Sequence, residues 1–280
     1  MVTCDVQPLR YGWQSDCIYL LRRIRQNCII YLLQDTVMNL GVGMIKKLLW
    51  IGFVGSILSL ICDFLLGWMV YPEASNHYIG MIASCAELSY LRLGLSALFG
   101  GIGIPMQYFG FKAIAEIVGK GTNKSAGLYR KLIHAGAIST AALGGSVHIL
   151  CVALMLIIRV ECNNGFDPLE AATLLESIPE SALQFALWGI LPFTIIMMTP
   201  YMIASLVMFW AIFKKFTYLP RWMCVLNPLA AKIILNAVAV VAPNSAVSNG
   251  LGMANMALGG MIPFLGILIW MYKDKKVSSF

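Results

Sequence analysis

Hydrophobic and polar residues alternate along this chain in long blocks. Six apolar runs, each longer than 20 residues, are separated by short gaps; the runs cover residues 48–71, 88–111, 132–158, 185–213, 222–242 and 251–272. A helix of about 20 residues crosses roughly 30 Å of hydrocarbon. The pattern therefore predicts an all-α fold, a polytopic membrane helical bundle with six transmembrane helices.

The basic residues fall in alternate gaps between these runs. Every Lys and Arg except Arg92, Arg159 and Lys232 lies before the first run, between the second and third, between the fourth and fifth, or after the sixth. Basic loops stay on the cytoplasmic side of a membrane. The pattern predicts that the N- and C-termini are both cytoplasmic, which agrees with an even number of spans.

The composition leaves little of the chain outside the bilayer. Hydrophobic residues make up 59% and charged residues 12% of the 280 residues, so we expect one six-helix transmembrane domain over residues 44–280 and no soluble catalytic domain. The basic residues behind the net charge of +7 border the apolar runs instead of clustering with aromatic residues. This placement favours anionic lipid headgroups on the cytoplasmic face as partners over nucleic acid, and indicates a multi-pass protein of the cell membrane.

Residues 1–43 differ from the rest of the chain. The segment Cys17–Gln34 is apolar at both ends but interrupted by arginines, so it is too charged to span a membrane. It is typical of an interfacial amphipathic helix on the cytoplasmic leaflet. The alternative is that translation starts at Met44, where two lysines and a long apolar run follow, and that residues 1–43 are an over-extended gene start.

Polar side chains inside the apolar runs are the candidates for function. Four ionisable groups, each from a different run, fall at similar depth, between the middle and the outer side of the membrane. Such a group costs roughly 2.5–3.5 kcal/mol at the centre of a transmembrane helix, so it usually faces a cavity or a partner. With two asparagines at similar depth, these groups predict one ligand pocket; its residues are Asp63, Arg92, His148, Lys232, Asn236 and Asn255.

The same residues also have purely structural explanations. Arg92 could extend to the outer headgroups, or pair with Asp63 across about 6 Å of depth. A lone histidine such as His148 is more often a satisfied hydrogen-bonding residue than a ligand. Lys232 is harder to explain in this way, because its side chain reaches the interface from the midplane only with strain.

No short catalytic motif occurs in the chain, neither HExxH nor GxSxG nor a run of paired acidic residues. We therefore expect no metal and no cofactor, and the pattern assigns no catalytic residue. The eight cysteines form no CxxC pair. Cys85 and Cys162 fall in predicted outer gaps, where they form a possible disulfide or, as we favour, remain two free thiols.

Four stretches carry a resemblance to a known family: ICDFLLGW around Asp63, LGGSVH ending at His148, PRWMCVLNPL from Pro220, and the last run after Asn249, rich in small residues. Over about residues 44–272 the chain resembles an uncharacterised family of bacterial six-span integral membrane proteins, a domain of unknown function. The resemblance implies a six-span fold in the bacterial inner membrane. It implies no activity and no site residues.

Three functions fit these patterns. The first is an integral membrane protein with a polar intramembrane pocket that binds or transports a small molecule or ion, as a transporter or sensor. The second is an intramembrane enzyme acting on a lipid-like substrate, with His148 and Asp63 as the acid/base pair. The third is a scaffolding subunit without a ligand. Hydrogen-bond contact between His148 and Asp63 would favour the enzyme, a cavity at Lys232 the transporter or sensor, and a bundle without a cavity the scaffold.

Overall fold

The structure is a computed structural model that describes residues 40–74, 76–121 and 123–273, without the side chains of residues 239 and 240. The chain divides into two units, Met1–Leu40 and Gly41–Phe280. The predicted interfacial helix at Cys17–Gln34 lies outside the described residues.

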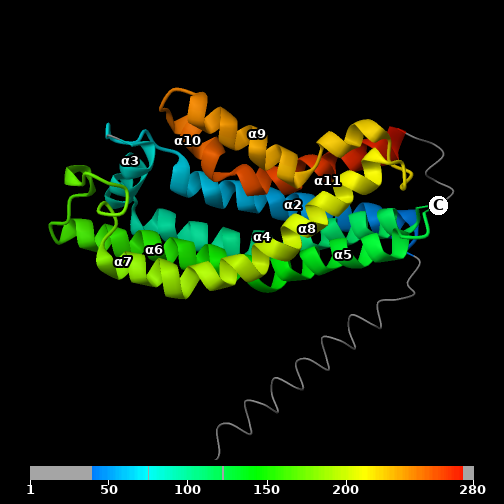
Figure 1. The fold of residues 1–280 in the computed structure, drawn as a ribbon, viewed down its shortest axis with the longest axis horizontal. Helices are drawn as coiled ribbons and strands as arrows, with labels where there is room; N and C mark the ends of the chain where they lie inside the picture. The colour runs from blue at the N-terminus through cyan, green and yellow to red at the C-terminus, as the bar shows by residue number, and fades with distance from the viewer. Residues whose placement is uncertain (1–39, 75, 122, 274–280) are drawn as a thin grey trace, which may run out of the picture. The chain divides into compact units, whose positions relative to one another are not determined.

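The described residues form helices and no strand, which confirms the all-α fold (Figure 1). In chain order the α-helices are α2 (Val42–Gly67), α3 (His77–Ala83), α4 (Tyr90–Gly119), α5 (Ala126–Ser139), α6 (Gly145–Asn163), α7 (Glu180–Gln184), α8 (Leu191–Phe213), α9 (Pro228–Val241), α10 (Ala246–Met253) and α11 (Asn255–Lys273). Two π-helical segments, η3 (Thr140–Gly144) and η5 (Phe185–Ile190), join α5 to α6 and α7 to α8. Short 3-10 turns are η2 (Ser84–Glu87), η4 (Pro168–Glu170) and η6 (Arg221–Val225).

Within the described residues, four helices are long and apolar enough to cross a membrane: Val42–Gly67, Ala126–Asn163, Glu180–Phe213 and Asn255–Lys273. They correspond to the first, third, fourth and sixth predicted spans. The pair His77–Glu87 and Tyr90–Gly119, bent by 108°, becomes a fifth if it counts as one span. The apolar helices thus fit a membrane protein, with four or five candidate spans where the sequence predicts six.

The fifth predicted span, residues 222–242, is the exception. Its helix α9 has 14 residues, which rise about 21 Å and fall short of the roughly 30 Å of hydrocarbon. The helix begins late because Pro228 lacks an N–H and suits a first helical position, while the Asn227 side chain accepts a hydrogen bond from the Leu229 N–H at 2.8 Å. Pro228 therefore starts a helix instead of kinking one.

Asparagines attach the turn between α9 and α10 to the segment after α2. The Asn244 side chain donates to the Tyr71 carbonyl at 2.8 Å and accepts from the Tyr71 N–H at 3.2 Å. Asn249 donates to the Met69 carbonyl at 2.8 Å. These bonds hold the α9–α10 hairpin against the end of α2.

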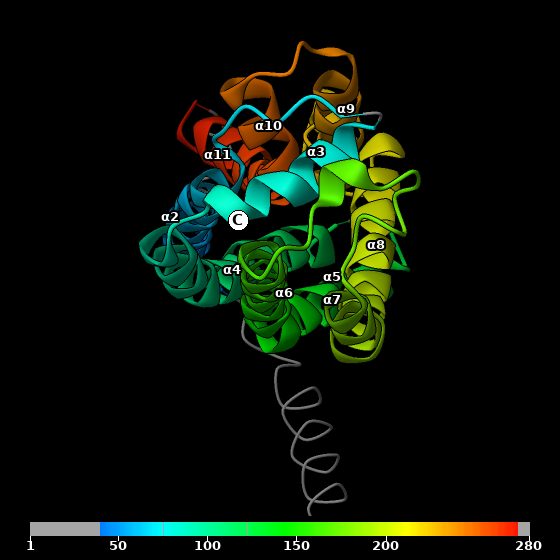
Figure 2. The same cartoon turned by 90° about the vertical axis from the view of Figure 1, so that its left-hand side faces the viewer.

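Helices α2 and α5 begin at one end of the bundle, and α4, α8 and α11 end there (Figure 1). Most basic residues of the described chain stand at these helix ends, whereas Arg92 stands near the start of α4, Arg159 near the end of α6, and Lys232 within α9. At this basic end the Lys46 ammonium lies 4.3 Å from the centre of the Tyr272 ring, so α2 starts where α11 finishes. The opposite end carries the two acidic segments, which are the connections between α2 and α4 and between α6 and α8. Helix α3 lies across this end (Figure 2). The separation of charge expected from the sequence is therefore a feature of the fold.

Glycines allow α2 and α4 to pack closely. A Cβ on Gly55 would lie 2.7 Å from the Gly103 carbonyl oxygen, and one on Gly52 would lie 2.5 Å from the Gly110 Cα. Helix α4 runs unbroken through Pro105. Close backbone approach of this kind is how membrane helices associate, and it fixes the rotation of α2 and α4 that determines which side chains meet.

Candidate functional site

A cavity of about 310 Å³ lies among α2, α4, α6, α9 and α11. Four of the six predicted pocket residues line it: Asp63 from α2, His148 from α6, Lys232 from α9 and Asn255 from the start of α11. The π-helical segment η3 contributes Thr140 and Gly144 to the same wall. Most of the other lining side chains are apolar, among them Ile104, Val147, Met197, Met253 and Met256.

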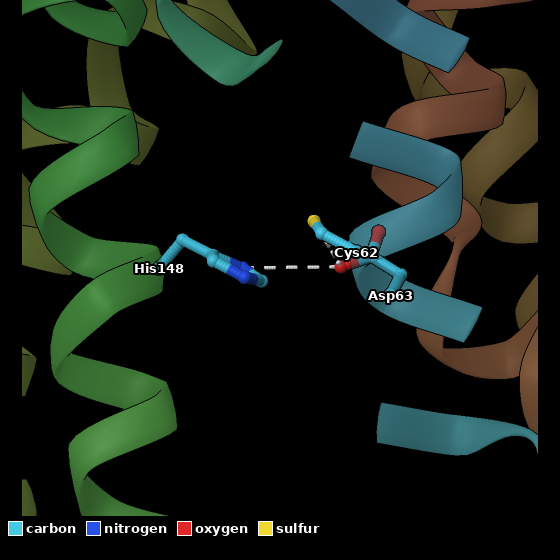
Figure 3. Close-up of side chains that lie close together, drawn as sticks. All are labelled: Cys62, Asp63 and His148. Atoms are coloured by element: carbon cyan, nitrogen blue, oxygen red, sulfur yellow. Dashed lines mark hydrogen bonds and ion pairs between the residues drawn. The ribbon is translucent and has the colours of Figure 1, made fainter. Parts of the chain in front are cut away.

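The imidazole of His148 sits where only a glycine leaves room for it. A Cβ on Gly100 would lie 2.1 Å from the His148 Cδ2 atom. The ring is 9% exposed, and its Nδ1 atom lies 3.9 Å from the Asp63 Oδ1 atom (Figure 3). Helices α2, α4 and α6 thus meet at this ring.

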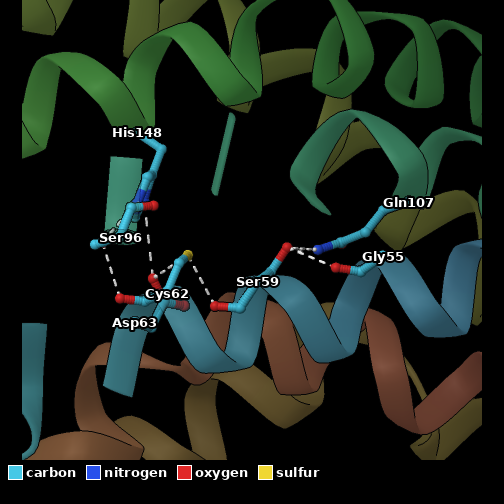
Figure 4. Close-up of polar contacts among 7 residues, drawn as sticks. All are labelled: Gly55, Ser59, Cys62, Asp63, Ser96, Gln107 and His148. Carbon is cyan, nitrogen blue, oxygen red and sulfur yellow. Dashed lines mark hydrogen bonds and ion pairs between the residues drawn. The ribbon is translucent and has the colours of Figure 1, made fainter. Parts of the chain in front are cut away.

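Hydrogen bonds to Ser96 define which nitrogen of His148 carries a proton. The Nε2 atom lies 3.2 Å from the Ser96 carbonyl oxygen, which can only accept, so Nε2 is the donor. The Ser96 hydroxyl donates its single proton to the Cys62 carbonyl at 2.9 Å. It therefore accepts from Nε2, at 3.1 Å (Figure 4). In the neutral ring the lone pair of Nδ1 faces Asp63.

A second polar chain continues along α2. The Gln107 side chain donates to the Ser59 hydroxyl at 2.9 Å, and Ser59 donates to the Gly55 carbonyl at 3.0 Å (Figure 4). Gln107 and Ser59 both line the cavity. Sequence reasoning missed these two residues and Ser96, since uncharged polar residues are common in membrane helices; the one available signal is the spacing of Ser59 and Asp63, one helical turn apart.

Cys62, Asp63 and His148 bring three possible metal ligands together, each ligand atom within 4.8 Å of the others. The Cys62 thiol lies 3.6 Å from the Asp63 Oδ1 atom and donates to the Ser59 carbonyl at 3.0 Å. The sequence predicted no metal site, because the ligands come from distant helices and form no short motif. The donor set of sulfur, oxygen and nitrogen is typical of zinc sites.

Arg92 does not belong to this group, and its predicted pairing with Asp63 is wrong. The guanidinium donates from Nε to the Leu65 carbonyl at 2.8 Å and from Nη2 to the Trp68 carbonyl at 3.4 Å. Carbonyls at a helix C-terminus lack intrahelical partners, so Arg92 caps α2. Within the described part of the chain it forms no ion pair with Asp63, although both lie near the same depth.

The remaining predicted pocket residues differ in their partners. Asn236 is exposed and accepts a hydrogen bond from the Asn255 side chain at 2.8 Å, which links α9 to α11 beside the cavity. The ammonium group of Lys232 forms no hydrogen bond or ion pair with any residue that the structure describes, although it lines the cavity.

The two outer cysteines pack together without a bond. Cys85 and Cys162 are free thiols in the structure. Both belong to one hydrophobic cluster near the acidic end, with Leu88 and Ile158. This arrangement corresponds to the free-thiol alternative.

Comparison with curated proteins finds no match, and comparison with solved structures finds none either. A family model described as a family of unknown function (DUF6796) matches residues 34–274, which is most of the chain and includes every residue of the cavity. The chain therefore belongs to the DUF6796 family of unknown function.

Proposed function

We propose that the protein binds a small organic anion in the cavity at Lys232, as a transporter or a sensor. The observation that carries the proposal is the position of Lys232, which lines the cavity and has no partner among the described residues. A lysine at the centre of a transmembrane helix costs roughly 2.5–3.5 kcal/mol. An anionic group bound beside it offsets that cost, so the lysine is best explained by a ligand.

The dimensions and lining of the cavity support a small molecule. Its volume is about 310 Å³. Ligand pockets typically have volumes of roughly 300–1,000 Å³, so this cavity is at the small end of the range. Such pockets combine an apolar lining with a few polar groups that orient the ligand. Here the polar groups are Lys232 from α9, Asn255 from α11, Asp63 from α2 and His148 from α6. They lie among methionines and aliphatic residues.

The distance between His148 and Asp63 argues against the enzyme alternative. The Nδ1 to Oδ1 distance of 3.9 Å leaves the two side chains without the hydrogen-bond contact that would favour the enzyme. A scaffolding role would need no cavity. Binding of a small anion is the alternative of the three that uses both the cavity and its unpartnered lysine.

Ligand binding can be tested with a panel of mono- and dicarboxylates and phosphate monoesters on the full chain in detergent. We expect at least one compound to raise the melting temperature, since a ligand at 100 times its Kd stabilises a protein by about 2.7 kcal/mol. Lys232→Met should abolish the shift. Lys47→Met, at an exposed position of the basic end, is the matched control and should retain it. No shift with any compound, or an unchanged shift in Lys232→Met, would disprove the proposal.

We further propose that the protein resides in a bacterial inner membrane with its basic end in the cytoplasm, against anionic headgroups. The support is the position of most basic residues near the starts of α2 and α5 and the ends of α4, α8 and α11, and the tendency of basic loops to stay cytoplasmic. Both termini would then be cytoplasmic, with the short helix α9 completing a sixth crossing.

Reporter fusions test this orientation. Fusions after Lys120, Lys215 and Lys276 are expected to report the cytoplasm. Fusions near Asn76 and Asp167, in the acidic segments, and near Asn249, after α9, are expected to report the outside. A cytoplasmic signal near Asn249 alone would show that α9 does not cross, and reversal at all sites would contradict the orientation.

A further inference from the structure

We propose that Cys62, Asp63 and His148 bind a divalent metal ion of the zinc class at the wall of the cavity. Thiolate, imidazole and carboxylate are together the ligands of borderline-soft ions such as Zn²⁺. The three ligand atoms already lie within 4.8 Å of one another. The inference goes beyond anion binding at Lys232 and does not depend on it.

Two of the three separations between the ligand atoms are close to those around a bound ion, and the third is within 4.8 Å. With Zn–S of about 2.3 Å and Zn–N or Zn–O of about 2.0–2.2 Å, tetrahedral ligands lie roughly 3.5 Å apart. The Cys62 Sγ to Asp63 Oδ1 distance is 3.6 Å, and the His148 Nδ1 to Asp63 Oδ1 distance is 3.9 Å (Figure 3). Small side-chain adjustments therefore suffice to coordinate one ion.

The protonation of His148 points to a cation between the ring and the carboxylate. Because Nε2 donates to the Ser96 carbonyl, the neutral ring presents the lone pair of Nδ1 to Asp63. The Nδ1 atom of His148 and the Oδ1 atom of Asp63 lie 3.9 Å apart, which is too long for a hydrogen bond. A metal ion placed between them accepts electron pairs from both.

Neighbouring residues hold the ligands as the surroundings of metal sites usually do. A metal-binding histidine commonly donates its second nitrogen to a carbonyl or carboxylate, which orients the ring, and Ser96 supplies that carbonyl here. Gly100 provides the space for the ring. Cys62 is fully buried, so on ion binding its thiolate would replace the thiol that now donates to the Ser59 carbonyl.

The proposed ion would have a coordination position facing the cavity. Asp63 and His148 line the cavity, whereas Cys62 is buried and does not line it. Three protein ligands with an open fourth position are typical of metal sites that act on a bound molecule, and closed sites with four are typical of structural ones. Water or a ligand in the cavity would occupy the open position.

Metal binding can be measured directly with Co²⁺ and Zn²⁺ as probes. The tag-free full chain in detergent is stripped with a chelator and titrated with Co²⁺. We expect one equivalent to bind, with visible bands of tetrahedral cobalt and a thiolate charge-transfer band, and Zn²⁺ to displace it. Cys62→Ser should remove the charge-transfer band, and His148→Gln and Asp63→Asn should each weaken binding at least tenfold.

Matched controls separate this site from other thiols and imidazoles. Cys224→Ser and His134→Gln alter a buried cysteine and a tyrosine-bonded histidine elsewhere, and both should bind cobalt as the unmodified protein does. Lys232→Met should lose anion binding and keep the metal, so the two proposals fail independently. Absence of a thiolate band in the unmodified protein would overturn the metal site without reference to any variant, as would its persistence in Cys62→Ser.

Discussion

Replacing Gly100 by alanine is expected to lower the free energy of unfolding by roughly 2–4 kcal/mol. The new methyl group would lie 2.1 Å from the His148 ring, so the ring must move. Movement breaks the hydrogen bonds from Nε2 to Ser96 and disturbs the packing of α4 against α6. Thermal unfolding in detergent, followed by tryptophan fluorescence, measures the loss.

The neighbouring glycine is the control for this prediction. At Gly101 the closest atom to a new Cβ is the Ile149 Cδ1 atom, at 3.3 Å, the end of a flexible side chain. Alanine favours a helix over glycine by about 1 kcal/mol at either position, so a loss confined to Gly100 reports the clash. The double variant Gly100→Ala with His148→Ala should recover part of the stability. Equal losses at Gly100 and Gly101 would contradict the account.

Breaking the ion pair between Glu116 and Arg130 is expected to cost roughly 2–3 kcal/mol. The Arg130 Nη2 atom lies 2.7 Å from Glu116 Oε1 at the basic end, with 9% of the Glu116 side chain and 26% of the Arg130 side chain exposed. Removing one partner of a fully buried pair costs about 3–5 kcal/mol, and partial exposure of Arg130 reduces the expected cost. Glu116→Gln and Arg130→Met should each lower the melting temperature.

A double-variant cycle tests the pair. Because each single variant already removes the contact between Glu116 and Arg130, the combined variant should cost less than the sum of the two. The same cycle at Asp63 and Arg92 should give additive losses, since Arg92 bonds to backbone carbonyls of α2 instead of to Asp63. Additivity at Glu116 and Arg130, or coupling at Asp63 and Arg92, would contradict the contacts of the structure.

The apolar runs predicted the long helices well, because length and composition decide whether a helix can cross hydrocarbon. They misplaced the start of the helix in residues 222–242, which begins only at Pro228. Its start depends on one missing N–H and on the side chain of Asn227. Hydropathy does not record either of these local backbone features.

The sequence predicted part of the candidate pocket, because it gives the depth of a residue along its helix. Depth along a helix can be counted from the sequence, and four of the residues grouped by depth, Asp63, His148, Lys232 and Asn255, line one cavity. The sequence does not show which neighbouring helix a side chain faces, because that depends on how the helices are rotated against one another. Arg92 shares the depth of the others but turns to the end of α2, so its assignment to the pocket failed.

The sequence by itself determined that the chain is helical and apolar, that most of its basic residues fall in alternate gaps between the apolar runs, and that a few polar groups lie at one level. Tertiary structure alone decided which of these groups meet. Close contact at Gly52, Gly55 and Gly103 sets the rotation of α2 against α4, and the space at Gly100 admits His148 beside Cys62 and Asp63. Such contacts depend on the relative rotation of helices distant in the chain, which no local pattern specifies.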